Sequence, residues 1–312
     1  MIEYHKKPIS GILLLDKPLG VSSNKAIQIA KHVFSAAKCG HTGTLDPVAT
    51  GLLPICFGEA TKFASMLLCA DKSYQAHIKL GFLSTTGDME GEIQPTATVE
   101  KKPSQQECEQ ILAQFIGKSM QIPPMHSALK HCGKPLYAYA RNNETIERKA
   151  REIFIHKIHI ESLQHNELCL QIHCGTGTYI RTLAEDIGKA LGCGGAYLTA
   201  LRRTSISNFE ISRAYRLSEL EAMDKNRLAN CLLPIDSFLT ELPPVFLDKT
   251  AALHLIQGRI VAHPPDTQEI HEPKLVRLYN DTEQFLGLGE INPERKIIAK
   301  RLLSNDHLLQ KQ

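Results

Sequence analysis

The feature that most constrains the fold is an irregular succession of apolar strand patterns and amphipathic helix patterns. GILLLD (11–16) is typical of a buried strand, and polar residues 22–24 then cap a segment with apolar residues at helical spacing. GLLPICFG (51–58) is a second apolar run, SYQAHIKLGF (73–82) alternates as a strand does, and residues 104–115 form a capped amphipathic helix. Because these patterns do not follow a regular strand–helix–strand order, we expect an α+β domain around a mixed sheet.

The character of the chain changes after the proline-marked stretch LLPIDSFLTELPP (232–244). Short apolar runs follow, VRLY, FLGLGE and KIIAKRLL, and polar turns separate them. This pattern is typical of a small β-barrel. A chain of 312 residues is long enough for two unequal domains. We therefore predict a larger domain at 1–240 and a small β-barrel domain at 241–312.

Residues 122–151 are polar, basic and interrupted by prolines, which predicts a long surface loop with one short helix around Leu136 to Arg141. The net charge of the chain is only +3, so a nucleic-acid partner requires local basicity. Charge alone favours a solvated face here over a binding surface. The cations in and beside this segment are Lys130, Lys134, Arg141, Arg148, Lys149, Arg151 and Lys157, and the acids are Glu144, Glu147 and Glu152.

Composition excludes several classes of protein. No apolar run approaches the roughly 18 residues needed to span a bilayer, and the start of the chain does not resemble a secretory signal, so we expect a cytoplasmic protein without a membrane partner. The nine cysteines lack a CxxC pair and the fourteen histidines lack an HExxH motif, so we expect reduced thiols and no bound metal. Without a coiled-coil heptad pattern, we expect a monomer.

Asp46 lies in GHTGTLDPVATG, where an aspartate before proline is ordinarily a turn-forming residue. As a reactive group, a carboxylate can be a general base, a metal ligand or a nucleophile. The sequence places no second carboxylate or His–Cys cluster beside it, which favours the nucleophile. Partial burial would raise its pKa unless a cation offset the desolvation, and Arg181 in GTYIRTL is a candidate for that cation.

A carboxylate that attacks an extruded nucleotide also needs an aromatic face for the base and donors that hold the nucleotide. Tyr74 and Tyr179 are candidates for the aromatic face, and His41 is a candidate donor. Each has a structural alternative. Tyr74 and Tyr179 could be core aromatics, and His41 could bind the backbone of its own loop.

Six blocks follow one another along the chain: LLLDKPLGVSSN (13–24), GHTGTLDPVATGLLPICFGEATKF (40–63), DKSYQA (71–76), PPMHSALKHCGKPLYAYAR (123–141), GTYIRTLAEDIGKALGCGGAYLTALRR (175–203) and LLPID (232–236). Together they resemble the bacterial TruB family of tRNA pseudouridine synthases. The resemblance implies isomerisation of a uridine in the T-loop of tRNA, position 55, without cofactor or metal. It also implies a mixed-sheet catalytic domain, and the tail is similar to the PUA-type RNA-binding domain of bacterial members.

The resemblance also implies roles for single residues. Asp46 matches the nucleophile, His41 the residue that helps to extrude the base, and Tyr74 the tyrosine that stacks on the uracil. Tyr179 and Arg181 match the pocket tyrosine and the arginine paired with the nucleophile.

Two further matches concern the base site and the support of the catalytic loop. Leu201 matches a leucine that lines the base site, although GCGGAYLTALRR carries one residue more than the commonest spacing. Lys17 and Pro18 match an element that supports the catalytic loop.

The residues leave two questions of mechanism and function open. Asp46 could add to ribose C1′, or the reaction could pass through a glycal after a base removes the C2′ proton, and in either route Tyr74 could carry a proton. The alternatives to an enzyme of this kind are a catalytically inactive RNA-binding or tRNA-folding protein and a metal-dependent hydrolase that uses His41 and Asp46. The first has no need of Asp46, and the second predicts inhibition by chelators.

Overall fold

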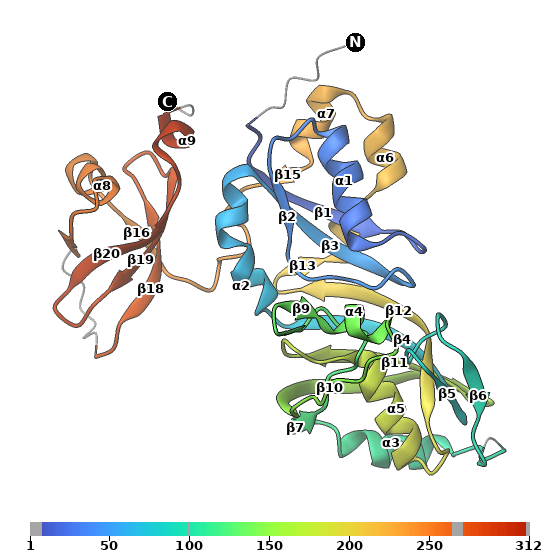
Figure 1. Ribbon diagram of the computed structural model, residues 1–312. Helices are drawn as coiled ribbons and strands as arrows, with labels where there is room; N and C mark the ends of the chain where they lie inside the picture. The colour runs from blue at the N-terminus through green and yellow to red at the C-terminus, as the bar shows by residue number, and fades with distance from the viewer. Residues whose placement is uncertain (1–7, 99, 264–270, 310–312) are drawn as a thin grey trace.

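The computed structural model describes residues 8–98, 100–263 and 271–309 (Figure 1). Its largest element is a mixed sheet of eleven strands, in which β2 (Cys39–His41), β13 (Phe209–Glu210) and β15 (Leu232–Leu233) pair at the sides of the main path. Along that path the strands are β14 (Tyr215–Arg216), β1 (Gly11–Lys17), β3 (Ala49–Phe57), β12 (Ala196–Ile206), β4 (Lys72–Leu80), β11 (Glu167–Cys174), β10 (Arg151–Gln164) and β7 (Gly117–Gln121).

Parallel and antiparallel pairing coexist in this sheet. β1 pairs with β14 and β3 pairs with β12 in parallel, whereas β4, β11, β10 and β7 continue the sheet with antiparallel neighbours. Helices interrupt the strands without a repeating order, so successive strands along the chain are not always neighbours in space. The predicted α+β class with a mixed sheet is therefore confirmed.

Helices cover the faces of the sheet and bury the core. α1 (Ser23–Val33) packs on β1 and β3 together with α6 (Leu217–Ala222) and α7 (Lys225–Asn230). α3 (Gln105–Ala113) and α5 (Ile180–Ala190) cover the half formed by β4, β10, β11 and β12. The predicted caps are confirmed, because Ser22 accepts a hydrogen bond from Lys25 N and Ser104 forms a capping box with Glu107.

A second sheet of five strands contains the three apolar runs predicted for the tail (Figure 1). In the rest of the chain, η1 (Gly58–Phe63) with α2 (Ala64–Leu68) is among its contacts, where the rings of Phe63 and Phe285 lie 5.7 Å apart. Lys62 Nζ also donates to Leu302 O at 3.1 Å. The elements of this part are β16 (Pro244–Phe246), α8 (Lys249–Ile256), β17 (Val261–Ala262), β18 (Lys274–Tyr279), β19 (Phe285–Ile291), β20 (Lys296–Leu302) and α9 (Asn305–Leu309).

The segment predicted as a surface loop contains a small hairpin of β8 (Lys130–His131) and β9 (Lys134–Pro135), followed by α4 (Leu136–Ala140). Its short helix is therefore confirmed. A second small hairpin, β5 (Phe82–Ser84) with β6 (Ile93–Pro95), projects after β4, and η2 (Ile211–Arg213) follows β13. Within the described ranges, the chain forms no helix with the length and apolar character needed to cross a membrane.

Candidate active site

The loop that carries Asp46 joins β2 to β3, and buried side chains fix it on both sides. Ser23 Oγ accepts from Leu45 N and donates to Leu45 O, both at 2.8 Å. On the other side, the fully buried Lys17 donates through Nζ to Pro47 O at 3.3 Å. Burial lowers the pKa of Lys17 to about 8, and the nearby carboxylate of Asp46 opposes this shift. The carboxylate therefore projects from a loop whose backbone is held directly before and after it.

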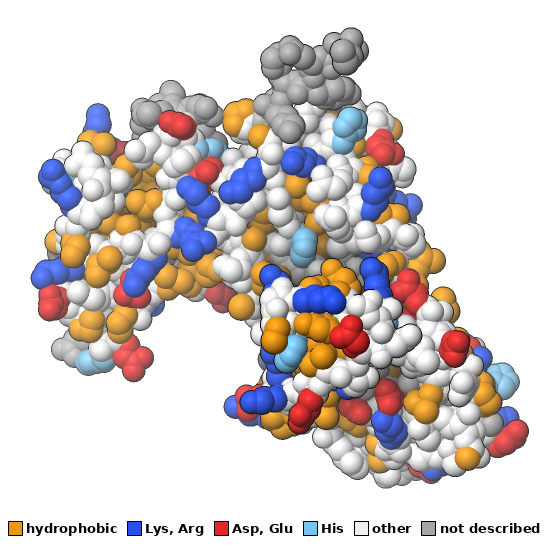
Figure 2. All heavy atoms as spheres, in the orientation of Figure 1, with side chains coloured by type: hydrophobic (Ala, Val, Ile, Leu, Met, Phe, Trp, Pro, Cys, Tyr) orange, Lys and Arg blue, Asp and Glu red, His pale blue; other side chains and the backbone are white. Residues whose placement is uncertain are grey.

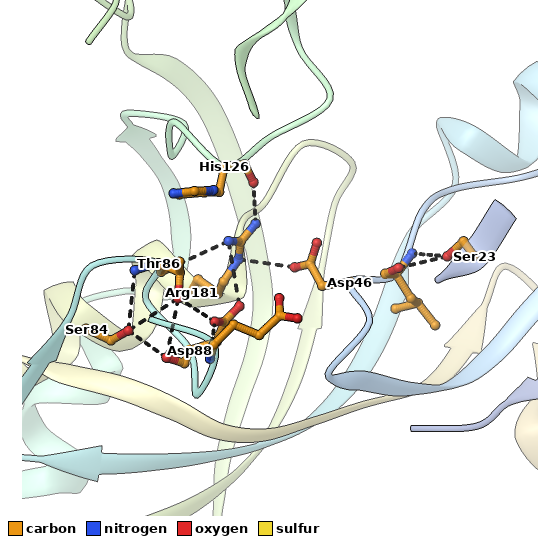
Figure 3. A network of polar contacts seen from close by, with 9 residues as sticks. Ser23, Asp46, Ser84, Thr86, Asp88, His126 and Arg181 are labelled. Carbon is orange, nitrogen blue, oxygen red and sulfur yellow. Dashed lines mark hydrogen bonds and ion pairs between the residues drawn. The ribbon is translucent and has the colours of Figure 1, made fainter. Parts of the chain in front are cut away.

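Arg181 is the cation that faces Asp46 (Figure 3). Its Nε lies 3.2 Å from Asp46 Oδ2, and its terminal nitrogens donate to Thr86 O at 3.0 Å and His126 O at 2.6 Å. A second carboxylate, the buried Asp88, lies 3.7 Å from the same guanidinium. Since three different loops supply these acceptors, the planar guanidinium has one orientation in the site.

The charge state of Asp46 reflects opposing effects. Burial raises the pKa of Asp46, and the guanidinium of Arg181 lowers it. The negative charge of Asp88 raises the pKa further, and the net shift is upward. Arg181 is thus placed where the sequence predicted a compensating cation, but it does not cancel the desolvation.

Arg203 connects the same loop to Tyr74. The guanidinium is 1% exposed, donates to Leu52 O at 2.7 Å and Gly43 O at 3.1 Å, and is hydrogen-bonded to the Tyr74 hydroxyl. Among the residues that the structure describes, no carboxylate pairs with it. Burial raises the pKa of Tyr74, and Arg203 opposes that shift. β12 approaches β3 so closely that a Cβ on Gly51, where φ is +104°, would lie 2.3 Å from Arg203 O.

A narrow cavity of about 10 Å³ lies between Asp46, Asp88 and Arg181, with Leu201 and Met89 in its lining. A cavity of this size holds about one water molecule, so it is closed to a nucleobase in this conformation. Two larger hollows, of about 560 and 600 Å³, flank α6 outside this site.

The remaining predicted residues lie around this centre with backbone contacts. His41 is half-buried, its Nδ1 accepts from Gly43 N at 3.3 Å, and burial lowers its pKa. Tyr179 precedes α5, and both its N–H and its carbonyl are bound by the side chain of Gln121, at 2.8 and 3.1 Å. Tyr74 is 8% exposed and belongs to the apolar core as well as to the bond with Arg203.

Sequence reasoning missed Asp88, His126 and Arg203. Asp88 lies in the turn-rich GFLSTTGDMEGE, and His126 contributes its backbone carbonyl, for which no residue type is a signal. Arg203 follows Leu201 by two residues in TALRR, and the alternation of a strand could have placed both on one face. The sequence contains no comparable sign that links Asp88 to Arg181.

Comparison with known proteins agrees with this architecture. Cbf5 in a Cbf5–Nop10–Gar1 complex superposes with a TM-score of 0.70 and 23% identity, over 94% of this chain and 84% of that one. The archaeal box H/ACA sRNP Nop10–Cbf5 complex gives a TM-score of 0.70 and 21% identity, over 97% and 88%. These similarities concern the fold alone.

Three family models match the sequence. Residues 31–180 match the TruB family pseudouridylate synthase N-terminal domain, and residues 181–240 match the tRNA pseudouridylate synthase B C-terminal domain. Residues 243–303 match the C-terminal part of pseudouridine synthase II TruB.

These family models place the chain among the pseudouridine synthases. Relatives named tRNA pseudouridine synthase B are 55% identical over 303 residues in Nitrosospira multiformis, covering 96% of both chains, and 51% identical in Nitrosomonas europaea, covering 93% of this chain and 95% of that one. The chain belongs to the TruB family, and its activity is that of a tRNA pseudouridine synthase, an isomerase.

Proposed function

We propose that the protein converts uridine 55 in the T-loop of tRNA to pseudouridine, with the base flipped out of the loop and Asp46 as the nucleophile. The observation that carries this proposal is the approach of Arg181 to Asp46, at 3.2 Å, in a cavity whose other walls are mainly apolar and include Leu201. The relatives' shared name, tRNA pseudouridine synthase B, supports the substrate class.

In the reaction, the bond from ribose C1′ to uracil N1 breaks and a bond from C1′ to uracil C5 forms. Asp46 adds to C1′ and uracil leaves as an anion, or a base removes the C2′ proton and a glycal forms. The rotated uracil then bonds to C1′ through C5. In the first route this bond displaces Asp46 as a free carboxylate, and in the glycal route the proton returns to C2′ as the bond forms. C5 then loses its proton to solvent and N1 takes up a proton. Tyr74 carries a proton in either route. The balance needs no oxidant, reductant or cofactor.

The other side chains prepare the pocket for the flipped uridine. Arg181 keeps Asp46 oriented, and Lys17 holds the backbone directly after it. His41 assists extrusion of the base, Tyr74 and Tyr179 supply aromatic faces, and Leu201 forms the apolar wall. Because the cavity is only about 10 Å³, entry of the base requires displacement of its lining, and Met89, which is 50% exposed, is the side chain with most freedom to move.

Two surfaces outside the pocket bind the phosphate backbone of the RNA. Figure 2 shows a hollow between the second sheet and the lower part of the molecule, with Lys and Arg side chains on both of its sides. We assign phosphate contacts to the basic segment 122–151 and to the small domain, which we place at 241–312 with the catalytic domain at 1–240. Phosphate contacts position the RNA, and the pocket reads the unstacked nucleotide.

Tritium release tests this proposal. The substrate is a T-arm stem-loop labelled at C5 of uridine 55, and the proteins are wild type, Asp46→Asn and Glu221→Gln, an exposed acid on α6. We expect release by wild type and Glu221→Gln, and none by Asp46→Asn with RNA binding retained. Release by Asp46→Asn at the wild-type rate contradicts the nucleophile. Tight binding without release by wild type means a protein that only binds or folds tRNA.

We also propose that the protein acts as a monomer in the cytoplasm and assists tRNA folding. All nine cysteines are unpaired, which suits a reducing compartment. A protein that opens the tRNA elbow to flip a base can help a misfolded elbow to refold without the chemical step. Equal acceleration of tRNA folding by wild type and Asp46→Asn supports this assistance, and the absence of any acceleration by either protein contradicts it.

A further inference from the structure

Three potential metal ligands meet at one end of the main sheet, outside the Asp46 pocket. They are Asp71, directly before β4, His156 in β10 and His173 in β11, and one ligand atom from each lies within 4.8 Å of those of the other two. His173 pairs directly with Ser73, so it shares the side of the sheet opposite to the buried side chain of Tyr74. The group is therefore separate from the site described above.

A break in strand pairing directs His156 toward this group. Ile155 pairs with Cys174 and Lys157 pairs with His173, which leaves His156 as an extra residue between two regular pairs. Such a bulge turns a side chain away from the position that regular alternation would give it. The ring of His156 lies 4.7 Å from that of His173, and its Nε2 lies 3.0 Å from Asp71 Oδ2.

The surroundings resemble those of a metal ligand. Ser73 Oγ is 3.0 Å from Nδ1 of His173, a bond that fixes the ring and leaves Nε2 for a cation. Asp71 is anchored at its carbonyl by Ser207 N, at 3.0 Å. The carboxyl is 47% exposed and His156 is 35% exposed, so solvent and ions reach both side chains.

We propose that Asp71, His156 and His173 bind a divalent transition-metal ion such as Zn²⁺. Two imidazoles and one carboxylate suit Zn²⁺, Ni²⁺ or Cu²⁺ far better than Mg²⁺ or Ca²⁺, which prefer oxygen ligands. With bonds of about 2.0–2.2 Å, tetrahedral geometry brings ligand atoms to roughly 3.5 Å from one another, and small side-chain rotations reach this from the observed arrangement. Water completes the coordination at the exposed side.

The proposed site differs from the expectation of no bound metal, which rested on the lack of a metal-binding motif. The ligands come from the start of β4, the bulge of β10 and the end of β11, so no HExxH or CxxC spacing indicates them. A bound ion would link the start of β4, the end of β11 and the bulge of β10. An ion that binds the folded chain more tightly than the unfolded chain stabilises the fold, and the effect grows with the concentration of the ion.

Zinc binding to the full chain, after removal of metals with a chelator, tests the proposal. Calorimetry and thermal melting with Zn²⁺ are compared for wild type, His156→Gln, His173→Gln and the control His159→Gln, an exposed histidine on the same strand. We expect one saturable equivalent and a rise in Tm for wild type and the control. We expect affinity to fall about tenfold or more in the two ligand variants.

Equal zinc affinity in all four proteins overturns the proposal, because the ion then binds elsewhere among the other histidines and the cysteines. Absence of saturable binding to wild type overturns it as well. Melting in chelator checks that each variant folds, and Asp71→Asn replaces any histidine variant that does not. Mg²⁺ at the same concentration is expected to leave the Tm of wild type unchanged.

Discussion

In the Asp46 pocket, charged side chains are held by groups from several loops, whereas cations of the basic segment 122–151 contact other residues of the same segment. Arg181 binds three loops, and Arg203 binds two backbone carbonyls and a tyrosine. In the segment, Lys134 lies 4.6 Å from the ring of Tyr139, and both residues belong to the same short hairpin and helix. Fixed groups suit the stabilisation of a reacting atom, and adaptable cations suit a phosphate backbone.

Among substitutions that distinguish the Asp46 pocket from the basic segment, Arg181→Lys is expected to have the largest effect on the reaction rate. A lysine has one charged centre and cannot reach the carboxylate of Asp46 and the carbonyls of Thr86 and His126 together. We expect the single-turnover rate to fall roughly 10²–10³-fold, with the Kd for the T-arm within a few-fold of wild type. Arg213→Lys, an exposed arginine on η2, is the matched control. If the affinity for the T-arm fell by as much as the rate, Arg181 would contribute to RNA binding and not specifically to the chemical step.

A smaller effect on rate is expected from Arg203→Met, because this residue acts through Tyr74 and the loop. The change leaves Leu52 O and Gly43 O without their donor, which costs about 1–3 kcal/mol each, so urea denaturation should show a loss of stability. The rate should fall roughly tenfold to hundredfold.

The pH profile of Arg203→Met distinguishes positioning from simple destabilisation. Arg203 lowers the pKa of Tyr74 against the effect of burial, so its removal raises that pKa further. If Tyr74 accepts a proton in the reaction, the rate limb that reports its ionisation moves to higher pH. Arg203→Lys should restore part of that displacement. A profile that coincides with that of wild type leaves Arg203 with a structural role only.

A substitution in the basic segment 122–151 should weaken RNA binding and leave the chemical step unchanged. Arg141 is exposed and stacks on Tyr137 at 5.3 Å, so Arg141→Ala removes a cation without disturbing the pocket. We expect KM for the T-arm to rise roughly threefold to tenfold, kcat to stay unchanged, and the slope of log Kd against log salt to decrease by about one. Lys25→Ala, on α1, serves as the comparison. A decrease in kcat at saturating RNA would contradict the assignment of chemistry to the Asp46 pocket and of RNA binding to the basic segment.

Local patterns predicted most elements of the fold. The strand at 11–16 and the helices capped by Ser22 and Ser104 depend on neighbouring residues, and the structure confirms them. The mixed sheet follows the predicted class, but its order depends on long-range pairing. No local pattern reports that β12 pairs in parallel with β3 and so brings Leu201 and Arg203 beside the loop of Asp46.

The site was less predictable for the same reason. Asp46 and Arg181 were selected because their residue types and loops suggested chemistry, and they do meet. Asp88 and the carbonyl of His126 complete the surroundings of Arg181 through tertiary contacts that carry no periodicity. The balance of burial and charge at Asp46 depends on these contacts, so the direction of its pKa shift could not be predicted without the three-dimensional structure.

The smallest expected effect concerns the stability that the folded protein loses because Asp46 is buried in its charged form. The pKa of Asp46 is raised above its unfolded value, chiefly by burial, so the stability linked to its protonation is present below the unfolded pKa and is lost as pH rises through the folded pKa. Asn resembles the protonated form, and Asp46→Asn should therefore melt about 1–2 °C above wild type at pH 7. The difference should shrink toward zero below about pH 4. A variant that melts below wild type at pH 7 would mean that the ion pair with Arg181 outweighs desolvation, and the pocket would then resemble a structural salt bridge more than a reactive site.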